Sequence, residues 1–165
     1  MSEQWRPVLG YEGFYEVSNE GRVRSLGRWT ATKGSGRRWA RGRNLRPAVG
    51  HAGHLRVDLS VYGKKRLHSV HVLVLEAFVG PRPPGMHCCH WDGDPQNNHV
   101  ANLRWDTPAA NSQDTLRHGR HPGANRTHCP QGHPYDEENT CYLSRGGRRC
   151  RTCQRDKERA RRRVA

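Results

Sequence analysis

The stretch of residues 85–119 constrains the fold most, because it predicts two strands and a helix in close succession. Met86 to His90 is a short run that can extend, and Asp92-Gly93 is a strong turn signal. A polar loop follows, and residues 100–105 alternate enough to predict a second short strand. Thr107-Pro108 then predicts a helix start, because a capping hydroxyl precedes a proline at the first helical position.

Three polar residues of this stretch, His90, Asn102 and Asn111, have a characteristic spacing. Asn102 follows His90 by twelve residues, and Asn111 follows Asn102 by nine. Gly119, just after Arg117 and His118, predicts the end of the helix. His90 therefore falls at the end of the first strand and Asn111 in the first turns of the helix. A hairpin crossed by a helix can bring these two side chains together.

The spacing of His90, Asn102 and Asn111 resembles that of the HNH endonucleases of phage and intron homing type. The flanking sequences LVLEAFVGP, HWDGD and NNHVANLRWDT extend the resemblance over about fifty residues. The resemblance implies a ββα-metal fold that cuts DNA with one divalent ion, Mg²⁺ or Mn²⁺. It also implies that His90 is the general base, that Asn102 pins the loop and orients that base, and that Asn111 ligates the metal.

The residue types agree with this chemistry. An imidazole titrates near neutral pH without tuning, which suits a general base. A hard cation would polarise the scissile phosphate and stabilise the leaving oxygen, and amide or carboxylate oxygens suit such an ion. A lone histidine is nevertheless more often structural or solvated, and asparagine-rich loops are common turn material. The catalytic hypothesis therefore depends mainly on the resemblance to the HNH family and less on the residue types alone.

One position departs from the family pattern. Relatives usually place a metal ligand, often a carboxylate, directly before the base, and this chain has Cys89 there. A thiol is a poor ligand for Mg²⁺. We expect the ion to be held by Asn111, waters and DNA phosphates. Two alternatives are that Asp92 or Asp94 also binds the ion, or that the protein uses a softer metal. Weak metal affinity without DNA is the consequence.

Three neighbouring residues receive structural interpretations. Asn98 and His99 are expected to shape the loop between the two strands, and His71 to pack or cap the apolar segment Val72 to Phe78. That segment ends at Gly80-Pro81 and predicts a short buried helix.

The charge of the chain favours a polyanionic partner. It carries 29 Lys and Arg against 15 Asp and Glu, a formal charge of +14. Arginine supplies most of the excess, and its planar fork suits phosphate oxygens, although a genome of high GC content would also favour arginine. Double-stranded DNA is the expected partner, and a monomer is expected rather than a dimer.

The apolar content predicts small modules instead of one large core. Only 33% of the residues are hydrophobic. No apolar run approaches the roughly 20 residues that span a bilayer, and the first residues do not resemble a signal peptide. We therefore expect a cytoplasmic protein without membrane contact, in which the six cysteines favour metal binding over disulfides.

The amino-terminal region predicts short strands followed by a basic segment. Residues 5–26 alternate apolar side chains with turn signals, which predicts two or three strands. The fragments GYEG, YEVSN and GRVRS resemble a module that often precedes this nuclease motif, which implies DNA contact, with a purely structural sheet as the alternative. Residues 28–46 have a flexible, cationic composition typical of a solvated linker or a loop along the phosphate backbone. Residues 54–61 predict a strand, which a basic turn joins to a returning strand.

The carboxyl-terminal region predicts a structural zinc site. Cys129-x3-His133 and Cys150-x2-Cys153 are two ligand pairs separated by a loop, the pattern of a tetrahedral Zn²⁺ site. His128 or Cys141 could replace His133 as the fourth ligand, and unpaired reduced cysteines are the alternative. The segment also resembles a cysteine-rich tail of some phage HNH proteins.

The chain from Gln154 onward is basic and has a high helix propensity, which predicts a phosphate-contacting helix or a disordered end. The residues expected to contact DNA are all basic and fall in several of these regions: Arg22, Arg24, Arg37, Arg38, Arg41, Arg43, Lys64, Lys65, Arg159, Arg161 and Arg162.

Together these patterns predict an α+β protein in three parts. Residues 1–48 would form the strand module and basic linker, residues 49–120 the HNH core, and residues 121–165 the zinc module with its basic tail. The expected function is divalent-metal-dependent cleavage or nicking of double-stranded DNA by phosphodiester hydrolysis. The competing hypothesis is a zinc-containing DNA-binding protein whose nuclease motif has decayed, and Cys89 is the feature that favours it.

Overall fold

The computed structural model describes every residue except 1, 121–122, 124, 145–146 and 165. The chain divides into two compact units, residues 1–114 (unit 1) and residues 115–165 (unit 2). Both units combine antiparallel strands with helices, and the expected α+β class is confirmed. The division into residues 1–48, 49–120 and 121–165 stays a prediction. The composition of residues 120–128 also predicts a linker, but positions 121, 122 and 124 of it lie outside the described residues.

An antiparallel sheet of four strands forms the amino-terminal part of unit 1. Its strands are β1 (Trp5–Pro7), β2 (Tyr15–Ser18), β3 (Val23–Ser25) and β6 (Arg43–Asn44), in the order β1-β2-β3-β6. The short strands expected over residues 5–26 are therefore confirmed. Alternation of apolar and polar residues predicts them because successive side chains in a strand point to opposite faces.

The basic segment after β3 is ordered as a hairpin. Strands β4 (Arg28–Ala31) and β5 (Arg37–Ala40) pair antiparallel, and the rings of Trp29 and Trp39 meet edge to face with centroids 5.6 Å apart. The expectation of a flexible linker or loop over residues 28–46 was wrong for this part. Its glycine and arginine content predicts flexibility, but the cross-strand tryptophan pair adds a contact that favours the hairpin.

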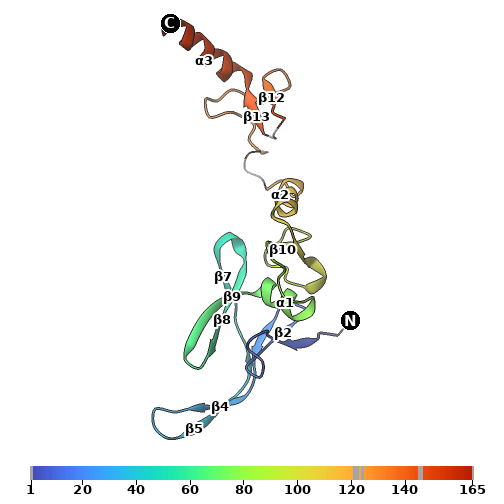
Figure 1. Ribbon diagram of the computed structural model, residues 1–165, viewed down its shortest axis with the longest axis vertical. Coiled ribbons are helices and arrows are strands. Elements are labelled where there is room, and N and C mark those ends of the chain that lie inside the picture. Colours follow the sequence, from blue (N-terminus) through green and yellow to red (C-terminus); the bar gives the residue numbers. More distant parts are fainter. Residues whose placement is uncertain (1, 121–122, 124, 145–146, 165) are drawn as a thin grey trace. The chain divides into compact units, whose positions relative to one another are not determined.

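A second sheet joins the amino-terminal part to the first helix. It contains β7 (Ala48–Val49), β8 (Leu55–Val61) and β9 (Lys64–Ser69), with the short 3-10 helix η1 (His51–Gly53) between β7 and β8. Helix α1 (Val70–Phe78) follows β9 directly, and this confirms the predicted buried helix. The helix contacts β1, β2, β8, β9, β10 and β11, so that several sequence-distant elements meet on it (Figure 1).

Unit 1 has one hydrophobic core that both of its halves supply. The core consists of buried aliphatic side chains and one tyrosine: Val8, Tyr15, Val17, Val23, Val57, Leu59, Val70, Leu73, Val74, Leu75 and Leu103. Because the sheet at the amino terminus and the hairpin near Leu103 both contribute, the strand module and the HNH stretch are packed on the same helix.

The predicted hairpin and helix complete unit 1. Strands β10 (His87–His90) and β11 (Leu103–Asp106) pair antiparallel, and helix α2 (Pro108–Arg117) begins at the expected proline. The Thr107 side chain accepts a hydrogen bond from the Ala110 amide at 3.1 Å, as expected of the cap.

The second strand of this hairpin is shorter than expected. Residues 100–102 form the 3-10 helix η2 (Val100–Asn102), and the strand begins at Leu103. The His99 ring accepts a hydrogen bond from the Ala101 amide at 3.2 Å, and the Val100 amide donates to the Asn19 carbonyl at 2.8 Å. These contacts hold the backbone in a turn, which the alternation of side chains did not reveal.

Unit 2 is a small hairpin followed by a helix. Strands β12 (Thr140–Tyr142) and β13 (Arg148–Cys150) pair antiparallel, and helix α3 (Arg151–Val164) confirms the expected basic helix. Among its described residues, only Cys129, Thr140 and Cys150 are buried. In the part of the chain that the structure describes, none of the helices has the length and apolarity needed to cross a bilayer.

Candidate functional site

The β10–β11 hairpin separates two environments around its central residues. In the register of this pair, His90 lies opposite Leu103 and Cys89 lies opposite Arg104. Leu103 belongs to the core beneath α1, whereas Arg104 forms ion pairs with Asp106 and with Asp114 of α2. Because neighbouring residues in a strand point to opposite faces, His90 lies on the α1 side and Cys89 on the α2 side.

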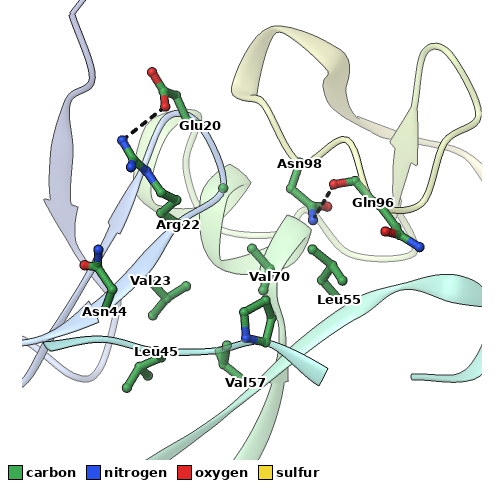
Figure 2. Close-up of a pocket in the computed structure, with 12 residues that line it drawn as sticks. Glu20, Arg22, Val23, Asn44, Leu45, Leu55, Val57, Val70, Gln96 and Asn98 are labelled. Atoms are coloured by element: carbon green, nitrogen blue, oxygen red, sulfur yellow. Dashed lines mark hydrogen bonds and ion pairs between the residues drawn. The ribbon is translucent and has the colours of Figure 1, made fainter. Parts of the chain in front are cut away.

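Asn98 fixes the tautomer of the His90 ring. The His90 Nε2 atom lies 3.2 Å from Asn98 Oδ1. The Asn98 Nδ2 group donates to the Gln96 carbonyl at 3.3 Å, a bond that Figure 2 shows. Since the amide nitrogen of Asn98 is already donating, its oxygen accepts from His90, and Nε2 therefore carries the hydrogen. The lone pair of the neutral ring is then on Nδ1.

The surroundings of His90 favour this neutral ring. Its side chain is 7% exposed, and burial lowers the pKa below the usual histidine value, against the raising effects of the Asn98 hydrogen bond and of Asp92 and Asp94. The imidazole is therefore unprotonated near neutral pH, as a group that accepts a proton must be.

The loop that carries Asn98 rests on the turn between β2 and β3. A Cβ atom at Gly21 would lie 2.7 Å from the Asn98 Cβ atom, and Gly21 has φ +83. Asn19 in the same turn accepts the hydrogen bond from Val100 described above. Gly21 and Asn98 also border a small pocket with Val23 and Val57 (Figure 2). The amino-terminal sheet thus positions the residue that orients His90.

Asn102 fixes the shape of the same loop. Its Oδ1 atom accepts from the Asp92 amide at 3.1 Å, and its Nδ2 group donates to Asp92 Oδ1 at 2.9 Å and to the Asn97 carbonyl at 2.8 Å. These hydrogen bonds place Asn102 at the base of the loop, and its predicted part in orienting the base stays a prediction. The direct hydrogen bond to His90 comes from Asn98, for which the sequence suggested only a part in shaping the loop.

Two further histidines surround His90. His54 follows η1, and His71 lies in the first turn of α1; their ring centroids are 5.5 Å and 5.2 Å from that of His90. Burial, followed by the charges of His54 and His90, lowers the pKa of His71 to about 3. His71 does pack at the start of the helix, as expected, but its proximity to His90 was not evident from the sequence.

The residues predicted to bind the catalytic ion differ in how well they suit it. Cys89 is 1% exposed and burial raises the pKa of its thiol, so that it stays neutral and does not fit a hard cation. Asp92 accepts hydrogen bonds from Asn97, Asn102 and the Asp94 amide, which commits it to the loop.

Asn111 fits the hard ion better. It lies in the first turn of α2, where its backbone N–H donates to the Thr107 carbonyl at 3.0 Å. Its side chain is half-buried. Its amide oxygen is a suitable ligand. A single neutral amide oxygen holds such an ion weakly, which agrees with an ion completed by waters and phosphate oxygens.

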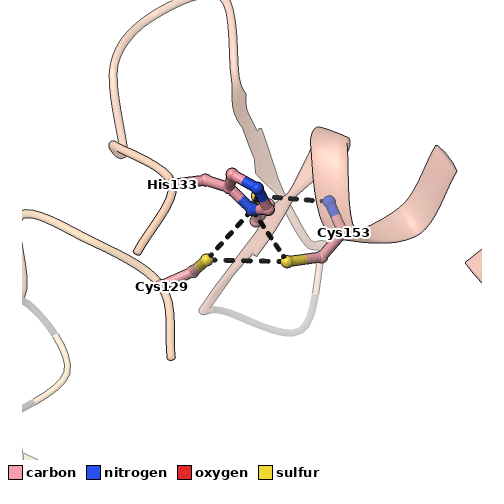
Figure 3. Close-up of side chains that lie close together, drawn as sticks. Cys129, His133 and Cys153 are labelled. Atoms are coloured by element: carbon pink, nitrogen blue, oxygen red, sulfur yellow. Dashed lines mark hydrogen bonds between the residues drawn. The ribbon is translucent and has the colours of Figure 1, made fainter. Parts of the chain in front are cut away.

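In unit 2, Cys129, His133, Cys150 and Cys153 converge on one point. Figure 3 shows three of them, Cys129, His133 and Cys153. The His133 Nδ1 atom lies 3.5, 3.7 and 3.3 Å from the sulfurs of Cys129, Cys150 and Cys153, and the sulfurs of Cys129 and Cys153 are 3.5 Å apart. A tetrahedral ion with Zn–S of about 2.3 Å and Zn–N of about 2.0 Å requires separations of about 3.5 to 3.8 Å. The four side chains therefore form a possible metal site with the correct dimensions.

The alternative ligands lie elsewhere. His128 Nδ1 bonds to the Thr127 hydroxyl at 3.0 Å, and the Cys141 thiol points to the Tyr142 carbonyl at 3.8 Å. Asn139 supports the site, because its Nδ2 group donates to the Cys150 sulfur at 3.3 Å and its Oδ1 atom accepts from the Thr152 amide at 2.9 Å.

The predicted DNA-contacting residues fall into two groups. Some already pair with acidic side chains of the protein: Arg22 with Glu3 and Glu20, Arg24 with Glu16, and Lys65 with Asp58. The others are exposed on strands, turns and a helix: Arg37, Arg38, Arg41, Arg43, Lys64, Arg159, Arg161 and Arg162. The second group is the more available to phosphates.

Comparison with known proteins agrees with the hairpin, loop and helix around His90. Residues 68–113 match the family model described as HNH endonuclease. The chain carries an HNH endonuclease domain. Residues 3–60 of this HNH protein match the NUMOD4 motif, which covers the amino-terminal sheet and the β4–β5 hairpin. The resemblance inferred from the sequence is thereby confirmed.

One curated relative is the DNA endonuclease I-HmuI of Bacillus phage SP01, to which this HNH protein is 32% identical over 116 residues. The match covers 70% of this chain and 59% of the relative. The solved structure titled "DNA binding and cleavage by the HNH homing endonuclease I-HmuI" matches with a TM-score of 0.57 at 31% identity, over 72% of this chain and 60% of that one. The chain thus spans less than two thirds of the length of either relative.

Proposed function

We propose that this HNH protein is a divalent-metal-dependent endonuclease of the homing type that hydrolyses phosphodiester bonds of double-stranded DNA. The observation that carries the proposal is the pair His90 and Asn98, because it holds a buried neutral imidazole with its lone pair on Nδ1. The relationship to I-HmuI, whose title names DNA binding and cleavage, supplies the substrate class.

In the proposed reaction, His90 Nδ1 accepts a proton from a water molecule as the water oxygen forms a bond to phosphorus. The bond between phosphorus and the leaving oxygen breaks, and that oxygen departs with the electron pair. Asn98 keeps the imidazole in the required tautomer, and Asn102 keeps the loop that carries Asn98 in place. A divalent ion, Mg²⁺ or Mn²⁺, held by Asn111 together with waters and phosphate oxygens, would offset the negative charge that develops on the phosphate and the leaving oxygen.

The exposed basic residues are proposed to hold the DNA backbone. Arg37 and Arg38 lie on the β4–β5 hairpin beside Trp29 and Trp39, whose side chains are 63% and 54% exposed. Arginine contacts phosphates, and an exposed indole can pack against sugar or base edges. With one active site in a monomer, nicking of one strand is the expected first product.

The site in unit 2 is proposed to bind Zn²⁺ with a structural role. Three sulfurs and one imidazole at tetrahedral separations are the ligand set of closed zinc sites. The Cys153 backbone amide and the Asn139 side chain donate hydrogen bonds to the Cys150 sulfur at 3.4 and 3.3 Å, and these bonds favour its thiolate form. Metal analysis of the purified full chain should find one tightly held zinc ion, and its absence would remove this part of the proposal.

A plasmid nicking assay with Mg²⁺ or Mn²⁺ tests the nuclease. His90→Ala should lower the rate by about 10²- to 10⁴-fold, the usual contribution of a general base, while DNA affinity stays near that of the wild type. His87→Ala is the matched control, since His87 is an exposed histidine on the same strand. Equal rates for the His90→Ala and His87→Ala variants would contradict the role of His90.

Cys89 supports one competing proposal, a zinc-containing DNA-binding protein without cleavage. Its neutral buried thiol replaces a ligand that would hold the ion. Under that alternative, the wild type binds DNA but does not cut with any divalent ion. The nuclease proposal instead expects cutting together with weak binding of Mg²⁺ to the free protein, and tight stoichiometric Mg²⁺ binding without DNA would contradict its ion site.

A further inference from the structure

Three histidines from separate parts of unit 1 lie together in one cluster. One ring nitrogen from each of His54, His71 and His90 lies within 4.8 Å of the other two. The ring centroids of His54 and His71 are 4.6 Å apart. The three residues come from the position between η1 and β8, the start of α1 and the end of β10, so that only the tertiary fold brings them together.

Two of these rings have a nitrogen without a partner. Among the described residues, the buried Nδ1 atoms of His54 and His71 make no hydrogen bond. His71 is 8% exposed, and a buried polar atom without a partner loses the hydrogen bonds that it makes in water. The third ring has its lone pair on Nδ1, because Asn98 accepts the hydrogen of Nε2. The cluster therefore offers several ring nitrogens that have no hydrogen-bond partner among the described residues and could bind an ion.

We propose that His54, His71 and His90 form a binding site for a divalent transition-metal ion of the Zn²⁺ class, and that occupancy of this site inhibits DNA cleavage. Three imidazoles suit zinc, cobalt or nickel and do not suit Mg²⁺. An ion about 2.0 Å from each nitrogen requires nitrogens about 3.4 Å apart, so the three rings move together slightly on binding.

The Asn98 contact favours this use of His90. Histidines that bind metals usually donate their other ring N–H to an oxygen, which fixes the orientation of the ring. His90 already makes such a bond to Asn98 Oδ1. Charges of both signs lie near the cluster. Arg56 lowers the pKa of His54 and of His71, whereas Asp92 and Asp94 act to raise the pKa of His90.

Inhibition follows from competition for one lone pair. When Nδ1 of His90 is bound to an ion, it no longer accepts a proton from water. This part rests on the proposed function, in which His90 is the general base, whereas metal binding by the three histidines does not. Saturating zinc should lower the nicking rate toward the level of His90→Ala, about 10²- to 10⁴-fold.

Binding is tested first, without any activity measurement. All five tryptophans lie between Trp5 and Trp105, so that their fluorescence reports the thermal unfolding of unit 1 alone. Added Zn²⁺ should raise the melting temperature of this transition in the full chain, and metal analysis should find one ion more than the cysteine site holds. Co²⁺ bound by histidines should lack the thiolate charge-transfer absorption of the cysteine site.

Variants of His54 locate the effect. His54→Gln removes a ligand at a half-buried position, and His54→Phe keeps a ring against His71 and His90. Both should lose the zinc-dependent shift and the additional ion, while the control His51→Gln, an exposed histidine of η1, should keep them. An equal shift in the His54 variants and the wild type, or no shift in the wild type, would overturn the site.

Activity is tested separately, with each variant compared with its own zinc-free rate at fixed Mg²⁺. Zinc should inhibit the wild type and His51→Gln but not the His54 variants. If the wild type binds the additional ion and still cuts at its full rate, the inhibitory role is wrong. If the wild type cuts under no condition but binds the ion through His54, the nuclease proposal fails, the inhibitory role falls with it, and the metal site stands.

Discussion

The two units of the chain are held together in different ways. Unit 1 buries eleven apolar side chains in a core shared by two sheets, a helix and the HNH hairpin. In the described part of unit 2, the buried residues are Cys129, Thr140 and Cys150, and two of these are proposed metal ligands. The same chain therefore uses hydrophobic burial to place one site and would use metal coordination to hold the other.

This difference predicts what each site tolerates. The histidines and asparagines of unit 1 are oriented by packing and hydrogen bonds that form without an ion. The hairpin and helix of unit 2 have too little apolar surface to be stable alone, so their order should depend on the metal. Changes to each unit can break or sharpen this comparison.

The largest effect is expected from Cys150→Ala. Structural zinc binding contributes about 10 to 16 kcal/mol in zinc-finger peptides, so the loss of one ligand should unfold unit 2. The backbone amides of β12 and β13 should lose their protection from hydrogen exchange. The melting temperature of unit 1, followed by tryptophan fluorescence, should stay unchanged. Cys141→Ala is the control, because Cys141 lies outside the cluster. Retained protection in the Cys150→Ala variant would show that unit 2 does not need the ion.

A smaller but reciprocal effect is expected from Leu59→Ala. Leu59 is fully buried, and truncation of a buried leucine costs about 2 to 5 kcal/mol. Denaturant unfolding followed by tryptophan fluorescence should show this loss, with zinc content unchanged. Leu67→Ala provides the control, since Leu67 is 55% exposed and should change stability by about 0.5 kcal/mol or less. Loss of zinc from the Leu59→Ala variant would mean that the two units depend on each other.

The smallest change in stability, with a clear change in activity, is expected from Gly21→Ala. Gly21 and Gly13 both have positive φ, +83 and +75, so an alanine is strained at either position by about 1 to 2 kcal/mol. Only the methyl group at position 21 would strike Asn98, whereas nothing lies within 4 Å of one at position 13. Gly21→Ala should therefore slow plasmid nicking well beyond the effect of Gly13→Ala, measured at a temperature where both variants are folded.

Equal nicking rates in the Gly21→Ala and Gly13→Ala variants would show that the position of Asn98 is not critical. A lower rate only in Gly21→Ala would tie the amino-terminal sheet to the orientation of His90. That result would sharpen the contrast between the units, because it would mean that a packed core in unit 1 sets the geometry of a catalytic side chain.

Local patterns in the sequence were sufficient for much of this protein. The turn at Asp92-Gly93, the cap at Thr107 and the spacing of His90, Asn102 and Asn111 predicted the hairpin, the helix and the family. The spacing of the cysteines and His133 predicted the cluster in unit 2. These signals are local because hydrogen-bonded turns, caps and short ligand motifs depend on residues close together in the chain.

Other features were decided only by the tertiary structure. The hydrogen bond from His90 to Asn98, the contact of Gly21 with that loop, and the approach of His54 and His71 all depend on how sequence-distant segments pack on α1. A histidine or asparagine has the same local signature whether it faces solvent or another side chain. Its chemistry is set by the burial and the partners that the fold supplies, and these are not encoded in any short stretch of sequence.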